Sequence, residues 1–91
     1  MSLILLLFLA KEFCSFGISQ GKLQSCSFES SITASQLQCV SQCMQTIGCL
    51  SVNIQKLSTS QYMCELNNGV HGMDQCTFDE DSQFMFYEIN I

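Results

Sequence analysis

Seven cysteines in a chain of 91 residues constrain its fold more than any other feature of the sequence. A chain this short has room for one domain, and its small hydrophobic core rarely stabilises a fold without cross-links. Cysteine at this density is typical of a disulfide-stapled scaffold, which belongs to an oxidising compartment. The cysteines are Cys14, Cys26, Cys39, Cys43, Cys49, Cys64 and Cys76.

The N-terminal segment is consistent with secretion. Residues 3–10 form an unbroken apolar run, Leu-Ile-Leu-Leu-Leu-Phe-Leu-Ala, whereas a membrane span needs roughly 20 apolar residues. The run therefore predicts a signal peptide and no membrane span. Gly17 and Ser19 are small and two apart, so we expect a signal peptide over residues 1–19 and a mature domain over 20–91. Cleavage there removes Cys14 and leaves an even number of cysteines. The alternative is a buried N-terminal segment.

The net charge of −5 comes from three basic and eight acidic residues. Nucleic acid and heparin are excluded as expected partners, because both require clustered Lys and Arg. The acidity gathers late in the chain, at Asp74 and in the run Asp79, Glu80 and Asp81. This run predicts a solvated loop, because it lacks the spaced oxygen ligands and turn glycine of a calcium site.

A helix is predicted over residues 34–47. Thr33 is placed to cap it, with Gln36 three residues later as in a capping box. Gly48 stands where a C-terminal cap is expected. Apolar residues follow at spacings of three, four and three, which is helical periodicity. They are Leu37, Val40, Met44 and Ile47.

After Gly48 the apolar pattern changes to a period of two. Leu50, Val52 and Ile54 alternate with polar residues, which predicts a half-buried strand over 50–55. The sequence Asn67-Asn68-Gly69 predicts a turn, because Asn-Gly tolerates a positive φ. The same reasoning predicts loops or turns over 27–35, 56–61 and 70–82, and strands over 24–28, 62–66 and 84–91.

The cysteine spacing limits which disulfides can form. Cys39 and Cys43 lie one helical turn apart, where Cβ atoms are about 5–6 Å apart and a disulfide needs about 3.8 Å. Each must therefore bond a cysteine of another element. Cys49 is close enough to bond Cys43, and Cys64 on the next predicted strand is then the natural partner of Cys39. Cys26 and Cys76 remain and could tie the two ends together, but six cysteines allow about 15 connectivities, so spacing alone does not fix the pairing.

Part of the chain resembles a known family. Residues 39–53 read Cys-Val-Ser-Gln-Cys-Met-Gln-Thr-Ile-Gly-Cys-Leu-Ser-Val-Asn, with Cys64-Glu65-Leu66 and a closing Phe86-Tyr87-Glu88 downstream. Two cysteines four apart on a helix, a third after a short turn, a Ser-x-Asn strand and a later Cys-x-Leu are similar to the core of the PAN/apple family. The resemblance covers about residues 26–89.

This resemblance implies an α+β fold, with one helix packed on a curved antiparallel sheet of about five strands and held by disulfides. It implies the pairs Cys39–Cys64 and Cys43–Cys49. The apple subgroup adds an outer bond, which maps to Cys26–Cys76, although here an acidic loop separates Cys76 from the last strand. Family members bind proteins or carbohydrates, and their ligand residues do not carry over by position.

Enzymatic and metal-dependent functions have little support in the sequence. The single histidine, His71, falls in a predicted loop, and a Cys–His nucleophile pair needs a free thiolate. A structural zinc site usually takes ligands from close Cys-x2-Cys pairs, which are absent. We therefore expect no enzyme, no cofactor and no metal.

The expected function is that of a secreted, non-catalytic binding module for an extracellular protein or glycan. Asp79, Glu80 and Asp81 form the candidate ligand surface, because loops on a rigid scaffold commonly carry binding, and their charge favours a basic protein. A structural or assembling component of a secreted matrix, or a fragment of a multidomain receptor or protease, are the alternatives. The oligomeric state stays open. Four aromatics are expected in the core rather than on a carbohydrate surface, namely Tyr62, Phe84, Phe86 and Tyr87.

Overall fold

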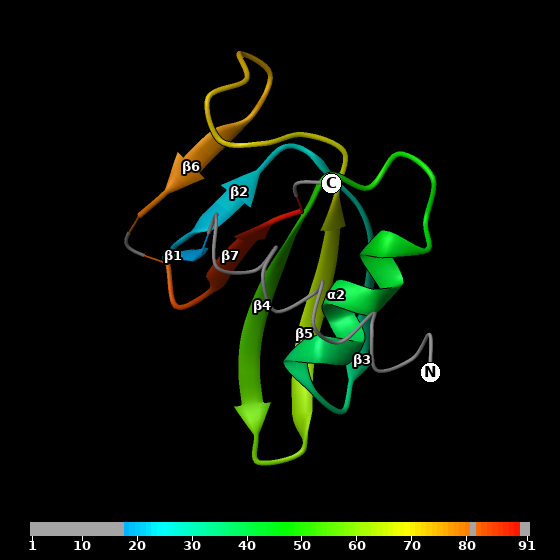
Figure 1. Ribbon diagram of the computed structural model, residues 1–91. Coiled ribbons are helices and arrows are strands. Elements are labelled where there is room, and N and C mark those ends of the chain that lie inside the picture. Colours follow the sequence, from blue (N-terminus) through cyan, green and yellow to red (C-terminus); the bar gives the residue numbers. More distant parts are fainter. Residues whose placement is uncertain (1–17, 81, 90–91) are drawn as a thin grey trace.

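A computed structural model describes residues 18–80 and 82–89 of the chain, which form two antiparallel sheets and one helix (Figure 1). The larger sheet has five strands in the order β1-β7-β4-β5-β3, and the smaller, outer sheet pairs β2 with β6. The elements are β1 (Ile18–Gln20), β2 (Lys22–Gln24), β3 (Ser27–Thr33), α2 (Gln36–Met44), β4 (Ser51–Ser58), β5 (Gln61–Asn67), β6 (Thr77–Asp79) and β7 (Met85–Glu88).

The five-stranded sheet is the middle layer of the molecule. Val52 and Ile54 of β4 belong to the core that α2 covers, whereas Asn53 between them bonds to β2 of the outer sheet. Successive side chains of a strand point to opposite faces, so α2 and the outer sheet cover opposite faces of the five-stranded sheet. The expected α+β class and disulfide scaffold are confirmed, but the prediction of a single sheet missed the outer one.

The centre of the fold is β4, which pairs with β7 on one side and β5 on the other. Four successive residues of this strand, 51–54, are all buried. Both faces of the strand are covered here, because the helix packs on one and the outer sheet on the other. The strand runs to Ser58 and turns at Thr59–Ser60, so the predicted turn over 56–61 began too early.

The N-terminus of α2 lies two residues later than expected. Thr33 is still in β3, where it pairs with Tyr62. Ser35 caps the helix, its hydroxyl accepting from the Gln38 amide at 3.1 Å. The Gln38 side chain in turn accepts from the Ala34 amide at 2.7 Å. The cap resembles a capping box, with the Ala34 amide in place of the Ser35 amide as the second donor. The assignment to Thr33 and Gln36 was wrong because strand pairing keeps Thr33 extended.

The helix also ends early, at Met44 rather than Ile47. The Thr46 hydroxyl donates to the Gln42 carbonyl at 2.7 Å, which satisfies one of the last helical acceptors. The chain then turns through Gly48, whose φ is +90°, and brings Cys49 back to Cys43 on the helix. A longer helix would carry Cys49 away from its partner, so this disulfide requires the early end.

Two further expectations about strands were wrong. The serine-rich segment predicted as a loop is mostly β3, which pairs with β5 from Ser27 to Thr33 with a register shift between Ser27 and Glu29. The Ser31 hydroxyl donates to the Gln42 side chain of α2 at 3.3 Å. The contact between this strand and the helix is therefore polar at Ser31. The predicted loop over 70–82 contains β6, whose three residues are set by pairing with β2.

Three disulfides join the layers, and their pairs are those that the resemblance implies. Cys39–Cys64 fastens α2 to β5, and both sulfur-bearing residues are fully buried. Cys43–Cys49 fastens the helix to the segment that follows it. The third pair, Cys26–Cys76, joins positions 50 residues apart and holds the start of β3 beside the approach to β6.

A glycine is needed at position 69 because a side chain would not fit there, and not because the backbone has a positive φ. The positive-φ residues of the described chain are Ser25, Gly21, Gly48 and Gly72, so the positive φ expected around Asn68-Gly69 is absent. A Cβ atom on Gly69 would lie 2.4 Å from the Cys76 sulfur and 3.0 Å from the Cys26 sulfur. The backbone at this position therefore packs directly against the third disulfide.

We predict that Gly69→Ala lowers the free energy of unfolding by about 2–3 kcal/mol, the usual cost of overpacking a core. Gly48→Ala is the matched control, because its Cβ meets no atom within 4 Å and its cost, about 1 kcal/mol, comes from the positive φ alone. Denaturant unfolding of the oxidised proteins measures both. An equal or smaller loss in Gly69→Ala would contradict the packing role.

Candidate binding surface

The outer sheet presents the acidic segment, and its inner side forms a small core of its own. Its strands β2 and β6 pair Lys22 with Asp79 and Leu23 with Phe78. Leu23 is fully buried beside Phe86 of β7 and the disulfide Cys26–Cys76. Phe78 meets Phe86 edge to face, with ring centroids 5.4 Å apart. The outer sheet is thus packed on β7 through aromatic and disulfide contacts.

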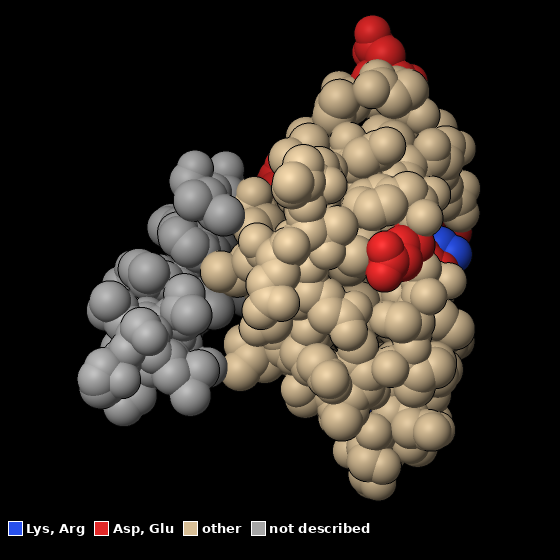
Figure 2. Space-filling view, turned by 90° about the vertical axis from the view of Figure 1, so that its right-hand side faces the viewer, with Lys and Arg blue, Asp and Glu red and all other residues tan. Residues whose placement is uncertain are grey.

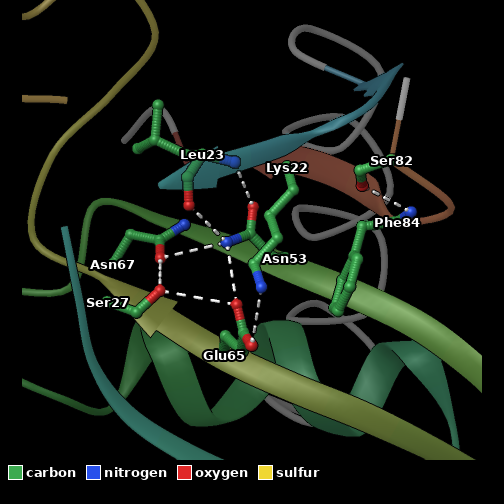
Figure 3. A network of polar contacts seen from close by, with 8 residues as sticks. All are labelled: Lys22, Leu23, Ser27, Asn53, Glu65, Asn67, Ser82 and Phe84. Carbon is green, nitrogen blue, oxygen red and sulfur yellow. Dashed lines mark hydrogen bonds and ion pairs between the residues drawn. The ribbon is translucent and has the colours of Figure 1, made fainter. Parts of the chain in front are cut away.

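One buried amide joins the outer sheet to the five-stranded sheet (Figure 3). Asn53 Oδ1 accepts from the Leu23 amide at 2.9 Å, and Asn53 Nδ2 donates to the Leu23 carbonyl at 2.8 Å. This pair of bonds is the one that a neighbouring strand residue would make in a ladder. The Asn53 side chain therefore replaces a strand between β4 and β2.

The remaining contacts of Asn53 join it to β5. Its Nδ2 also lies 3.1 Å from Glu65 Oε1 and 3.3 Å from Asn67 Oδ1. Asn67 Oδ1 accepts from the Ser27 hydroxyl at 2.7 Å, and Asn67 Nδ2 donates to the Ser51 hydroxyl at 3.0 Å. Strands β3, β4 and β5 are therefore linked by side chains as well as by their ladders, as Figure 3 shows in part.

This polar network is satisfied internally. The Ser51 hydroxyl donates to the Gly69 carbonyl at 2.7 Å, deep in the fold. No buried side-chain nitrogen or oxygen of the described residues lacks a hydrogen-bond partner. Because the hydrogen-bonding groups of the network are already paired within the protein, we assign it the structural role of holding the outer sheet in place.

Lys22 is committed to the same network at its exposed rim. Its ammonium lies 3.4 Å from Glu65 Oε2 and 4.6 Å from the centre of the Phe84 ring (Figure 3). Its ladder partner in β6 is Asp79. The Lys22 charge is therefore balanced by carboxylates within the protein. The accessible charge around the outer sheet comes from the acidic side chains of residues 74–80.

The structure describes two of the three acidic residues of the candidate ligand surface, and it places them differently. Asp79 lies in β6, half-buried and opposite Lys22, whereas Glu80 is exposed at the end of the strand. Asp81 lies outside the described residues. Asp74, in the loop that precedes β6, is exposed as well. Among the described acidic residues of this segment, Asp74 and Glu80 present the most accessible carboxylates.

His71, the single histidine of the sequence, lies in the loop before β6. His71 is exposed and stacks on the Phe78 ring, with ring centroids 4.3 Å apart. All six described cysteines are bonded in disulfides, so none of them offers a thiol to this histidine. Over residues 18–80 and 82–89, no group of His, Cys, Asp or Glu is arranged to hold a metal ion.

The aromatic residues of the last strands belong mainly to the interior. Phe86 and Tyr87 are buried, on the outer-sheet side and the helix side of β7 respectively. Tyr62 packs against the core beneath α2. Phe84 is half-buried and lies under the Lys22 ammonium. These positions agree with the expectation that the aromatics serve the core rather than a carbohydrate surface.

The opposite side of the molecule has a different character, which the sequence analysis missed. Residues 23–55 contain one charged side chain, that of Glu29. Figure 2 views the side on which α2 and β3 lie and shows few charged atoms there. Phe28, Ile47, Gly48 and Asn68 line a shallow hollow of about 320 Å³. The run of uncharged residues was the signal that would have indicated this surface.

Comparison with models of known families, with curated proteins and with solved structures finds no match to this chain. Within residues 18–80 and 82–89, no helix combines the length and the apolar character needed to cross a membrane.

We predict that Asn53→Ala lowers the free energy of unfolding by about 2–3 kcal/mol, because the Leu23 amide and carbonyl stay buried without partners. Gln55→Ala, two residues along the same face of β4, is the matched control and costs less than about 1 kcal/mol. Amide hydrogen exchange should show lost protection at Leu23 in Asn53→Ala alone. Unchanged exchange at Leu23 would argue against the bridging role.

Proposed function

We propose that this chain is a secreted, non-catalytic binding module of the PAN/apple kind, which recognises an extracellular protein with a basic surface. The outer sheet and the loop before it form the contact. The observation that carries the proposal is the pairing of a rigidly held outer sheet with exposed carboxylates at Asp74 and Glu80.

The arrangement of helix and disulfides supports the family assignment. One disulfide joins α2 to β5 and a second joins α2 to the segment after it, as the resemblance implies. The Ser-x-Asn motif contributes Ser51 and Asn53, both fully buried and hydrogen-bonded. The outer pair Cys26–Cys76 corresponds to the bond of the apple subgroup.

Electrostatics favours a basic protein over other ligands. Lys22, the basic residue of the outer sheet, is engaged with Glu65 and Phe84. The carboxylates of Asp74 and Glu80 therefore face solvent on a surface where a cationic partner gains attraction and faster association. Three intrachain disulfides are compatible with an extracellular protein, and the bonded state of the described cysteines supports a non-catalytic role.

The binding proposal is tested with arrays of purified extracellular proteins and, in parallel, of glycans. We expect binding to proteins with basic surfaces, weakened about five- to tenfold by Asp74→Asn with Glu80→Gln and less sensitive to salt in that variant. Glu29→Gln, an exposed carboxylate on β3, is the control and should leave affinity unchanged.

Glycan binding without protein binding, or an affinity that ignores Asp74 and Glu80, would overturn the proposal. An equal effect of Glu29→Gln would show that net charge alone, rather than the outer sheet, governs the interaction.

The first strand leads us to propose a cleavage site other than the one after Ser19 that the sequence analysis expects. Ile18 and Ser19 belong to β1 and pair with Tyr87 and Phe86 of β7, so cleavage after Ser19 would remove most of that strand. Ser15 and Gly17 are also small and two apart. We therefore expect cleavage after Gly17, with Cys14 removed.

A non-reducing peptide map of the secreted protein checks this expectation, because it reports both the mature N-terminus and the cysteine pairs. The expected result is an N-terminus at Ile18 with the three disulfides described above. A mature protein beginning at Gln20, or one that retains Cys14, would contradict it.

A further inference from the structure

Within residues 18–80 and 82–89, no further strand pairs with the outer edge of β3, which lies on the uncharged side of the molecule. Strand β3 pairs with β5 and is the last strand in the sheet order. An edge strand presents a row of backbone amides and carbonyls that can pair with another strand. Seven residues long, β3 matches β5 in length and is the longer of the two edge strands.

The features that usually protect an edge strand are mostly missing from β3. Its sequence, Ser-Phe-Glu-Ser-Ser-Ile-Thr, has no lysine or proline and one charge, at Glu29. A register shift between Ser27 and Glu29 makes the beginning of the strand irregular. Residues 29–33 pair regularly with β5, so their outer side forms a regular backbone edge.

The distribution of charge over the chain favours a second copy of the protein as the partner of this edge. The chain carries a net charge of −5, yet residues 23–55 contribute a single carboxylate to it. Two copies that approach through other acidic surfaces repel each other, whereas the side with α2 and β3 in Figure 2 brings few charges together. Phe28 and Ile32 of β3 are both large, apolar and about half exposed, at 44% and 51%.

The sequence of β3 is also compatible with pairing to itself. In an antiparallel pair centred on Ser30, Glu29 stands opposite Ser31. The two carboxylates then do not face each other, so no like charges lie directly opposite across the strands. A two-fold axis through the centre makes the contact identical on both copies.

We propose that two copies of this chain pair β3 to β3 across a two-fold axis and so join their five-stranded sheets into one. The small contact predicts weak association, with a dissociation constant on the order of 10 µM. This inference is independent of the proposed function, because the outer sheet lies on the opposite face from α2 and stays accessible in the dimer.

Sedimentation velocity over a concentration series tests the pairing. We expect the wild-type protein to shift from monomer to dimer, and Ile32→Lys to weaken dimerisation by about tenfold or more, since edge lysines oppose strand pairing. Leu57→Lys is the matched control, because Leu57 is exposed to a similar degree, 47%, on β4. Circular dichroism and the disulfide map verify that both variants fold.

A cross-link tests the register independently. Oxidation of Ser30→Cys should give a covalent dimer, because Ser30 meets its own copy at the centre of the proposed register. Ser60→Cys, in the turn between β4 and β5, should stay monomeric under the same conditions. A wild-type protein that is monomeric at every concentration, a dimer that Leu57→Lys weakens as much as Ile32→Lys, or no preference for the Ser30 cross-link would overturn the proposal.

Discussion

The two-sheet arrangement depends on one side-chain amide. Asn53 bonds both the amide and the carbonyl of Leu23, and so does the work of a strand between β4 and β2. Without it, the outer sheet would be held to the larger sheet by Phe86, one ion pair and the disulfide Cys26–Cys76. The placement of the acidic segment, and with it any contact that this segment makes, therefore follows from a residue buried beneath it.

The sequence predicted what depends on short-range chemistry. Two cysteines one helical turn apart must find partners on other elements, which led to the disulfides Cys39–Cys64 and Cys43–Cys49. The helix and the strands around Val52 and Cys64 had a clear period. The position of Glu80 in an exposed part of the acidic segment also followed from composition. Apart from the choice of Cys64, 25 residues away, as the partner of Cys39, each of these inferences needed only neighbours in the chain.

The errors concern residues whose state is decided by distant partners. The serines of β3 have no strand signature, and pairing with β5 makes them a strand. The outer sheet has two strands of three residues, too short for any period to appear. Gly69 suits a turn by composition, yet it is buried against a disulfide between residues far away in sequence. The same holds for Asp79, whose half-buried position opposite Lys22 comes from sheet pairing.

The burial of residues 51–54 on both faces of β4 has a consequence for divergence among related sequences. Val52 and Ile54 pack in the core on the helix side. The side chains of Ser51 and Asn53 form hydrogen bonds with Gly69, Asn67, Glu65 and Leu23. A substitution at any of these four positions affects both the five-stranded sheet and a second set of contacts, those with the helix side or those of the polar network. Proteins that keep the same three layers are therefore free to change most of their surface, whereas this short stretch must change slowly or together with its partners.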